Sequence, residues 1–280
     1  MNLHENIGDA ELVTKIKLKG TLKALPDFYV NKEVAEFKKK HPKAGPMEVF
    51  KAVRKKLHES YGAYQNRKKR RRTLYLEELK LAREENWGKE KNSPEMKEVR
   101  RRMIRTSVSA TERLEADYNS IYEPMHKELG KFKTLMDLGC GINPVSFCPS
   151  DYKEVKIYAY DIDSGDIEFL NKYFKIMGMN GEANVLDLHD LEAVDKLPKV
   201  DVCLLFKIID PLERRGHEFS EQLIKRLKAK QIVVSFATKT ITRKSMNHPN
   251  RGWFEQMIKR LGKTYKTIKT NNEIYYVVKN

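Results

Sequence analysis

The segment Thr134–Pro144, TLMDLGCGINP, places the strongest constraint on the fold of this chain. An apolar run with Asp137 near its end is followed at once by Gly139 and Gly141, which predicts a buried strand that leads into a tight turn. Glycine permits positive φ angles and lets a ligand approach the backbone closely. A nucleotide-like cofactor commonly occupies such a turn, although G-x-G turns also form where only chain geometry requires them. The flanking sequence must decide between these two interpretations.

Short apolar runs alternate with helical patterns from this segment onward. The apolar runs lie at residues 134–138, 155–161, 183–188, 200–206 and 231–236, and the helical patterns at 165–177, 211–228 and 253–261. This alternation predicts a parallel sheet with both faces covered. Two later strand-like runs, 265–268 and 274–279, flank the turn at 270–272 and predict an antiparallel hairpin. We therefore predict an α/β fold with a Rossmann-like sheet and a C-terminal hairpin, the layout of a class I methyltransferase.

An N-terminal α-helical region is predicted before the sheet. Apolar residues recur at helical spacing in three sets, which are Val30, Val34 and Phe37; Val49, Phe50, Val53 and Leu57 after Pro46; and Leu74, Leu76, Leu79 and Leu81. Residues 1–20 carry no clear structural signal, and residues 87–94 are expected to break the pattern. A further helix is predicted to begin with Ser109 or Thr111 as its N-cap and to end near Gly130.

Positive charge is concentrated in the first third of the chain. Residues 1–105 hold 28 of the 55 Lys and Arg residues but 15 of the 39 Asp and Glu residues, and therefore carry +13 of the net charge of +16. Such asymmetry indicates a polyanionic partner, either nucleic acid or an anionic membrane. We expect a basic helical RNA-binding domain at residues 1–105 and a catalytic domain at residues 106–280.

Several other classes of protein are not expected. The chain has no apolar run of 18 residues and no apolar signal core at its N-terminus, so we expect no membrane span and no secretion. Cys140, Cys148 and Cys203 lack C-x-x-C spacing, so we expect no disulfide framework, no metal and a cytoplasmic location. Nothing in the sequence requires a dimer, and we expect a monomer.

Carboxylates follow the next two predicted strands. Asp161 ends the second apolar run, where it can accept hydrogen bonds from both hydroxyls of a ribose. Asp187 lies in the third run, where it can accept from an adenine amino group while Leu188 covers the ring. The alternative is that these aspartates only end strands and cap helices. We favour a cofactor site, because the three signals fall at the carboxyl ends of consecutive strands, where open α/β sheets bind ligands.

The glycine turn distinguishes S-adenosylmethionine (SAM) from a dinucleotide. Asn143 and Pro144 stand where a dinucleotide-binding turn has its third glycine. Asp137 suits the ammonium of a methionine moiety better than a pyrophosphate. The sequence therefore favours SAM and ranks a dehydrogenase last.

The motif MDLGCGINP at residues 136–144 resembles that of the aminoglycoside-resistance 16S rRNA methyltransferases, which methylate guanine N7 in the decoding site. Other segments resemble further motifs of that family in the same order, namely residues 52–64, 109–114, 204–213, 234–240 and 273–279. The resemblance covers most of the chain. It implies SAM as the cofactor, 16S rRNA in the small ribosomal subunit as the partner, and methyl transfer to guanine N7.

The resemblance and the residue pattern together give three sets of candidate residues. The predicted cofactor-binding residues, in which Arg113 meets the carboxylate of SAM, are Arg113, Asp137, Gly139, Gly141, Asn143, Asp161, Ile162, Asp187, Leu188 and Phe206. The predicted catalytic residues, at or just after strand ends, are Lys207, Ser235 and Lys239. The predicted RNA-binding residues are Arg54, Lys55, Lys56, Arg67, Lys68, Lys69, Arg70, Arg71, Arg72, Arg100, Arg101, Arg102, Arg105, Arg243, Lys244 and Met246. Phe206 or Phe236 could stack on a flipped base or belong to the core, and we favour the core for Phe206.

Two alternatives stay open at this point. Ala237 replaces the family's usual proline and residues 240–246 lack its usual glycines, so the target base is less specified than the reaction. One alternative is methylation of another rRNA position, such as an adenine nitrogen. Enzymes of that kind would have an N/D-P-P-F/Y motif, which residues 206–211 match only in part. The other is a ribosome-assembly factor that binds SAM without this activity.

Overall fold

The computed structural model describes residues 7–18, 20–62, 65–85, 93–115, 117–213, 217–239, 246 and 250–279. Its α-helices are α1 (Asp9–Lys17), α2 (Asp27–Lys40), α3 (Pro46–Ser60), α4 (Arg72–Glu85), α5 (Pro94–Ile104), α6 (Val108–Glu115), α7 (Tyr118–Leu129), α8 (Ser164–Met177), α9 (Leu191–Asp195), α10 (Ile209–Leu212), α11 (Glu218–Arg226) and α12 (Gly252–Arg260). Short 3-10 helices are η1 (Gly20–Ala24), η3 (Arg67–Arg71) and η4 (Asn143–Ser146). The strands are β1 (Thr134–Leu138), β2 (Lys156–Asp161), β3 (Gly181–Val185), β4 (Val200–Phe206), β5 (Ala229–Ala237), β6 (Thr264–Lys269) and β7 (Glu273–Lys279).

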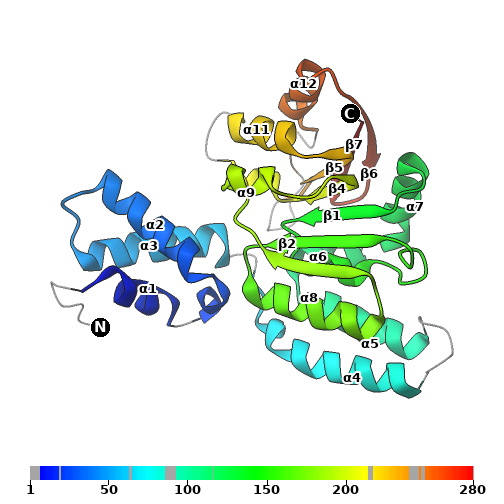
Figure 1. The fold of residues 1–280 in the computed structure, drawn as a ribbon, viewed down its shortest axis with the longest axis horizontal. Coiled ribbons are helices and arrows are strands. Elements are labelled where there is room, and N and C mark those ends of the chain that lie inside the picture. The colour runs from blue at the N-terminus through cyan, green and yellow to red at the C-terminus, as the bar shows by residue number, and fades with distance from the viewer. Residues whose placement is uncertain are drawn as a thin grey trace.

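The strands form a seven-stranded sheet in the order β3-β2-β1-β4-β5-β7-β6, visible in Figure 1. Strands β1 to β5 are parallel, whereas β7 runs antiparallel to β5 and pairs with β6 as a hairpin. The predicted parallel sheet with a C-terminal hairpin is therefore confirmed. Parallel strands bring the carboxyl ends of β1, β2 and β4 to one edge, and this arrangement places the candidate site.

Apolar side chains alternate between two covered faces of the sheet. Leu135 of β1 packs in a core with α4, α5, α7 and α8, whereas its neighbour Met136 packs in a core with α11 and α12. The same alternation holds in β4, where Leu204 and Leu205 belong to the two different cores. Burial on both faces explains why these strands read as continuous apolar runs in the sequence.

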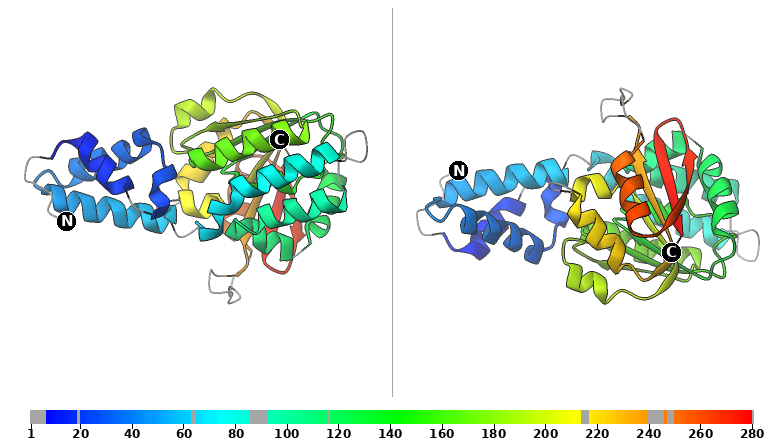
Figure 2. Two further views of the ribbon diagram at one scale, coloured as in Figure 1. Left: turned by 90° about the horizontal axis from the view of Figure 1, so that it is seen from below. Right: turned by 90° about the horizontal axis from the view of Figure 1, so that it is seen from above.

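The N-terminal helices pack in two separate groups. Helices α1, α2 and α3 share a core that contains Leu12, Ile16 and Val53, and Figures 1 and 2 show them projecting from one end of the sheet. Helices α4 and α5 instead add their apolar side chains to the core of the sheet. Apolar side chains up to Tyr61 therefore pack in one core, and those of α4 and α5 pack in another. The expected domain boundary was at residue 105. Charge alone does not mark this change, because basic residues occur in α1, α2 and α3 and also in α4 and α5.

Several expected helices differ in detail. Helix α1 lies in the segment that gave no clear signal. The helix expected from Ser109 or Thr111 to Gly130 is split into α6 and α7, because Asp117 adopts a φ of 65°. The Oγ atom of Ser107, not of either predicted cap, accepts from the backbone N–H of Ala110 at 3.5 Å.

Two further expectations are corrected. Residues 211–228 form the separate helices α10 and α11. On α4, Leu76 and Leu79 are buried, whereas Leu74 and Leu81 are exposed because they lie on the opposite stripe of the helix. The break expected at residues 87–94 falls mostly outside the described residues.

Candidate active site at the carboxyl ends of the strands

The glycine turn after β1 is fixed by its backbone. Gly139 and Gly141 have φ angles of 66° and 48°, and a Cβ on Gly139 would lie 2.5 Å from Cγ1 of Ile208. A side chain at Gly139 would therefore be strained and would also clash. The N–H of Gly139 donates to the carbonyl of Tyr160 at 2.8 Å, which holds the turn against the end of β2.

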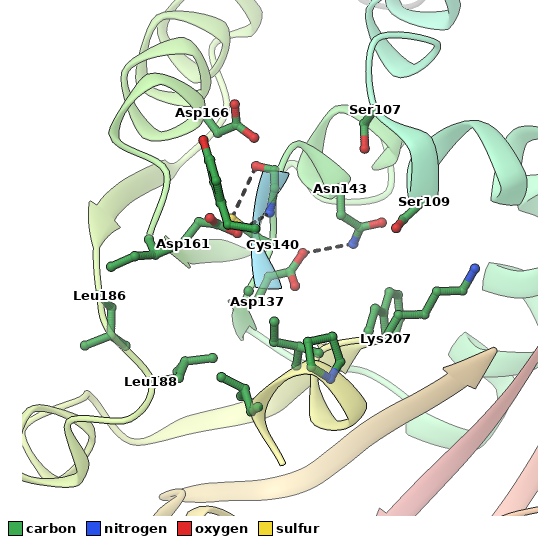
Figure 3. Close-up of a pocket in the computed structure, with 18 of the residues that line it drawn as sticks. Ser107, Ser109, Asp137, Cys140, Asn143, Asp161, Asp166, Leu186, Leu188 and Lys207 are labelled. Carbon is green, nitrogen blue, oxygen red and sulfur yellow. Dashed lines mark hydrogen bonds between the residues drawn. The ribbon is translucent and has the colours of Figure 1, made fainter. Parts of the chain in front are cut away.

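Asp137 lies at the centre of the site with half of its carboxylate unpaired (Figure 3). It is fully buried, and its Oδ2 accepts from Nδ2 of Asn143 at 2.9 Å, whereas Oδ1 is buried without a hydrogen-bond partner. Burial raises the pKa of Asp137 to about 7, against the opposing effects of Asn143 and Arg113. An unpaired buried acceptor is costly, so this oxygen is suited to a cationic hydrogen-bond donor from a ligand.

Arg113 is held beside Asp137 by side chains from distant elements. Its Nε lies 3.1 Å from Oε2 of Glu273 on β7, and its NH1 donates to Oδ1 of Asn143 at 3.2 Å. Its guanidinium carbon lies 4.9 Å from the ring centroid of Phe206. Asn143 therefore contacts both Asp137 and Arg113 and links the two charges.

Asp161 closes the turn from β2. Its Oδ2 accepts from the N–H of Gly141 at 2.8 Å, and its Oδ1 accepts from the N–H of Asp163 at 2.9 Å. Burial, followed by the nearby charge of Asp166, raises the pKa of Asp161 to about 7. The orientation of this carboxylate is thus set by two backbone donors, and Asp161 lines the pocket.

Asp187 already has two hydrogen-bond donors from the protein, which the sequence did not predict. Its Oδ2 accepts from Nζ of Lys32 on α2 at 2.7 Å, and its Oδ1 accepts from the N–H of His189 at 2.9 Å. Although burial alone would raise the pKa of Asp187, the hydrogen bonds from His189 and Lys32 lower it to about 2. A ligand amino group would share this carboxylate with Lys32.

All ten predicted cofactor-binding residues line one pocket, which extends from the glycine turn to the loops after β2, β3 and β4. Figure 3 shows Asp137, Asn143 and Asp161 near its centre, with Leu186 and Leu188 along one side. The sequence missed four lining residues from the N-terminal region, which are Tyr29, Ser60, Tyr61 and Gln65. No local pattern marks them, because the tertiary packing of the N-terminal region brings them to the pocket.

Of the three predicted catalytic residues, Lys207 lines the pocket, whereas Ser235 and Lys239 do not. Ser235 is fully buried and donates from Oγ to Glu273, so it is not available to a substrate. Lys207 has a φ of 55°, and its Nζ lies 2.5 Å from Glu112 and 3.4 Å from Glu273. Lys239 is partly exposed just beyond β5. Phe236 is fully buried, and Phe206 is nearly so, which places Phe236 in the core and Phe206 between the core and the pocket.

Glu273 is a buried carboxylate that the sequence did not single out. It is fully buried on β7 and contacts Arg113, Ser235 and Lys207. Burial disfavours its charge, but Arg113 and Lys207 hold its pKa below the usual value. Glu273 is therefore shared by the two cations of this wall of the site, and Lys207 also pairs with Glu112.

The predicted RNA-binding residues divide into exposed and buried groups. Those that are exposed are Lys55, Lys56, Arg67, Lys68, Arg70, Arg71, Arg101 and Arg105. Arg72 and Arg100 are buried, where Arg72 pairs with Asp166 and Arg100 donates to the carbonyl of Phe147 at 2.6 Å. These two residues are thus corrected from RNA contacts to internal contacts.

The remaining candidates are intermediate in exposure or lie outside the described chain. Arg54 donates to the carbonyl of Ile16 at 2.9 Å, Lys69 pairs with Asp163, and Arg102 lies 2.5 Å from Glu78. The N–H of Met246 donates to the carbonyl of Thr238 at 2.9 Å. Arg243 and Lys244 lie outside the described residues.

The described part of the chain holds neither a candidate membrane span nor a candidate metal site. No helix there is long and apolar enough to cross a membrane. No group of three or more His, Cys, Asp or Glu side chains in the same ranges is placed to hold a metal ion.

Comparison with known proteins gives a consistent group of relatives. Residues 30–277 match the family model described as ribosomal RNA methyltransferase (FmrO). The chain is 27% identical over 235 residues to a 16S rRNA (guanine(1405)-N(7))-methyltransferase of Frankia casuarinae, which covers 83% of this chain and 80% of the relative. A Proteus mirabilis protein of the same name is 25% identical over 250 residues, 83% of this chain and 84% of the relative.

The fold is also similar to a solved structure. The crystal structure of the 16S rRNA methyltransferase RmtF in complex with S-adenosyl-L-homocysteine superposes with a TM-score of 0.76. That alignment covers 98% of this chain and 99% of the other at 19% identity, so the likeness extends over the N-terminal helices as well as the sheet.

Proposed function

We propose a reaction for this chain from the premise that it belongs to the FmrO family of ribosomal RNA methyltransferases. The protein transfers the methyl group of SAM to N7 of a guanine in the decoding region of 16S rRNA, within the small ribosomal subunit. The relatives named as guanine-N7 methyltransferases support this choice of atom. The observation that carries the proposal is the buried Asp137, which has one unpaired oxygen beside a buried arginine.

The side chains around the pocket fit SAM at each end. Oδ1 of Asp137 would accept from its ammonium group, and Arg113 would face its carboxylate. Asp161 would accept from the ribose hydroxyls, and Leu186 and Leu188 would contact the adenine. Gly139 and Gly141 allow the positive φ angles of the turn, and a Cβ on Gly139 would clash with Ile208. The ten residues first proposed from the sequence remain the proposed cofactor site.

The chemistry requires positioning more than proton transfer. SAM, when bound, supplies a methyl group on a sulfonium. Guanine N7 has a lone pair and no proton at neutral pH, so the new C–N bond forms as the C–S bond breaks and its electrons stay on sulfur. No general base is needed, and the protein acts by orientation and electrostatics. Lys207 and Lys239 remain candidates for contact with the target guanine, whereas Ser235 holds Glu273 instead.

Recognition of the rRNA is assigned to the exposed cations of the N-terminal region. The exposed members of the two basic runs would contact phosphates, which give affinity without sequence information. A guanine N7 in folded RNA is accessible after the base turns out of its stack, at a cost of a few kcal/mol. We further propose that the protein acts as a monomer in the cytoplasm, where small subunits are found.

One experiment tests the proposed function. The protein is incubated with methyl-labelled SAM and purified small ribosomal subunits, and modified bases are mapped by strand scission specific for N7-methylguanine. We expect label at one guanine of the decoding region. Label in the rRNA without scission at a guanine would support the alternative rRNA position, and SAM binding without transfer would support an assembly factor; either result overturns the proposal.

A further inference from the structure

The basic run at residues 67–72 points in two directions. Residues 67–71 form the 3-10 helix η3, in which side chains three residues apart lie on the same face. Lys69 lies in η3, and Arg72, three residues later, is the C-cap of η3 and the first residue of α4. Their side chains are 23% and 7% exposed. Lys68, Arg70 and Arg71 are exposed. The run therefore consists of an inward pair and an outward set.

The inward pair contacts the start of α8. Nζ of Lys69 forms ion pairs with both Asp163 and Asp166, and NH1 of Arg72 pairs with Asp166. Asp163 is the N-cap of α8, and its Oδ1 accepts from the N–H of Asp166 at 3.0 Å. The hydroxyl of Tyr61, the residue that follows α3, also donates to Asp163. Two cations thus meet two buried carboxylates next to the pocket.

These carboxylates border Asp161, the proposed ribose acceptor. Asp163 gives its N–H to Asp161, and the charges of Asp166 and Asp163 both raise the pKa of Asp161 after burial itself. Three groups from other elements also interact electrostatically with Asp161. They are Asp137 of β1, Cys140 of the glycine turn and Tyr61 just after α3. Every one of these groups is neutral or negative. Lys69 and Arg72 are therefore the cations that offset the acidic cluster.

We propose that Lys69 is a positioning residue for cofactor binding, which balances Asp163 and Asp166 so that Asp161 accepts the ribose hydroxyls of SAM as a carboxylate. This inference rests on the proposed function, because it needs the pocket to bind SAM. Lys69 acts through its two partners and does not line the pocket itself. Without the ammonium of Lys69, Asp163 would lose its ion pair, whereas Asp166 would keep Arg72. Asp161 would then hold its proton to a higher pH.

The test compares Lys69 with its outward neighbour. SAM binding to the full chain is measured by calorimetry at pH 7 and pH 9 for the wild type, Lys69→Met, Lys69→Arg and the matched control Lys68→Met. For a rise of one unit in the pKa of Asp161, Lys69→Met should bind SAM about fivefold more weakly at pH 7 and within about twofold of wild type at pH 9. Lys69→Arg and Lys68→Met should match the wild type at both pH values.

The pH dependence separates positioning from a structural role. An unchanged affinity in Lys69→Met, or an equal loss at pH 7 and pH 9, would overturn this inference while the proposed function stands. A wild type that binds no SAM would overturn the proposed function and this inference with it.

Discussion

Asn143 donates from Nδ2 to Oδ2 of Asp137 at 2.9 Å, and this bond fixes the buried carboxylate with Oδ1 unpaired. The same amide accepts from Arg113 through Oδ1 at 3.2 Å. Asn143 therefore orients the two side chains that would hold the charged end of SAM.

Replacement of Asn143 by alanine should weaken SAM binding. Asp137 would lose the amide donor that orients its carboxylate, and the loss of a buried hydrogen bond to a charged group corresponds to about 1.5–3 kcal/mol, or roughly tenfold to a hundredfold in Kd. Calorimetric titration with SAM measures this. Asn171→Ala is the matched control, since the side-chain amide of Asn171 also makes hydrogen bonds through both its nitrogen and its oxygen, but to the backbone of Ala183. Equal SAM affinity in Asn143→Ala and the control would contradict the prediction.

Asp137 should make the cofactor-free protein less stable as the pH rises. The folded-state pKa of about 7 lies above the unfolded value near 4, so the group's stabilising contribution is complete below pH 4 and is lost as the pH rises through 7. The Asp137→Asn variant lacks this loss. Its free energy of unfolding should therefore rise by about 2–4 kcal/mol relative to that of the wild type between pH 5 and pH 8. Urea unfolding without SAM at both pH values measures the difference. A difference in the free energy of unfolding between the two proteins that does not change with pH would refute this assignment. Asp161 is present in both proteins and titrates in the same direction in each, so it does not produce the difference between them.

The sheet and the glycine turn could be predicted because their signals are local. Apolar runs and turn residues mark β1, β2, β4 and β5, and the carboxylates at the strand ends follow in the sequence. Contacts between distant segments left no such signal. Glu273 reaches Arg113 across 160 residues, and Tyr29 and Tyr61 reach the pocket by the packing of α2 and α3. The direction of each cation in the run at 67–72 depended on a 3-10 geometry that charge counting cannot show.

Loss of the Glu273 carboxylate should destabilise the fold strongly. Glu273→Leu would leave Arg113 and Lys207 without their shared buried acceptor, and breaking a buried ion pair in this way costs about 3–5 kcal/mol. Denaturant unfolding measures the loss. Glu182→Leu is the control, because Glu182 pairs with Lys156 at the surface, where an ion pair contributes about 0–1 kcal/mol. Similar losses in the two variants would show that the buried cluster does not support the fold.

The outward cations of η3 should contribute to RNA affinity and not to SAM affinity. Arg70 and Arg71 are exposed, whereas Lys69 and Arg72 of the same run are turned inward. The slope of log K against log salt concentration is negative, and each phosphate contact that is lost reduces its magnitude by about 0.7–0.9. The variant Arg70→Gln/Arg71→Gln should therefore bind small ribosomal subunits more weakly, with a slope smaller in magnitude by about 1.5. It should bind SAM as the wild type does.

A charge-matched control distinguishes a specific contact from net charge. Lys266 and Lys269 are exposed on β6, the edge strand at the opposite side of the sheet from β3 (Figure 1). The variant Lys266→Gln/Lys269→Gln removes the same charge and should keep the wild-type salt slope in filter-binding titrations at several salt concentrations. If both double variants lower the slope equally, affinity follows the total charge of the protein. If the η3 variant alone loses SAM binding, the inward and outward roles within this run are assigned incorrectly.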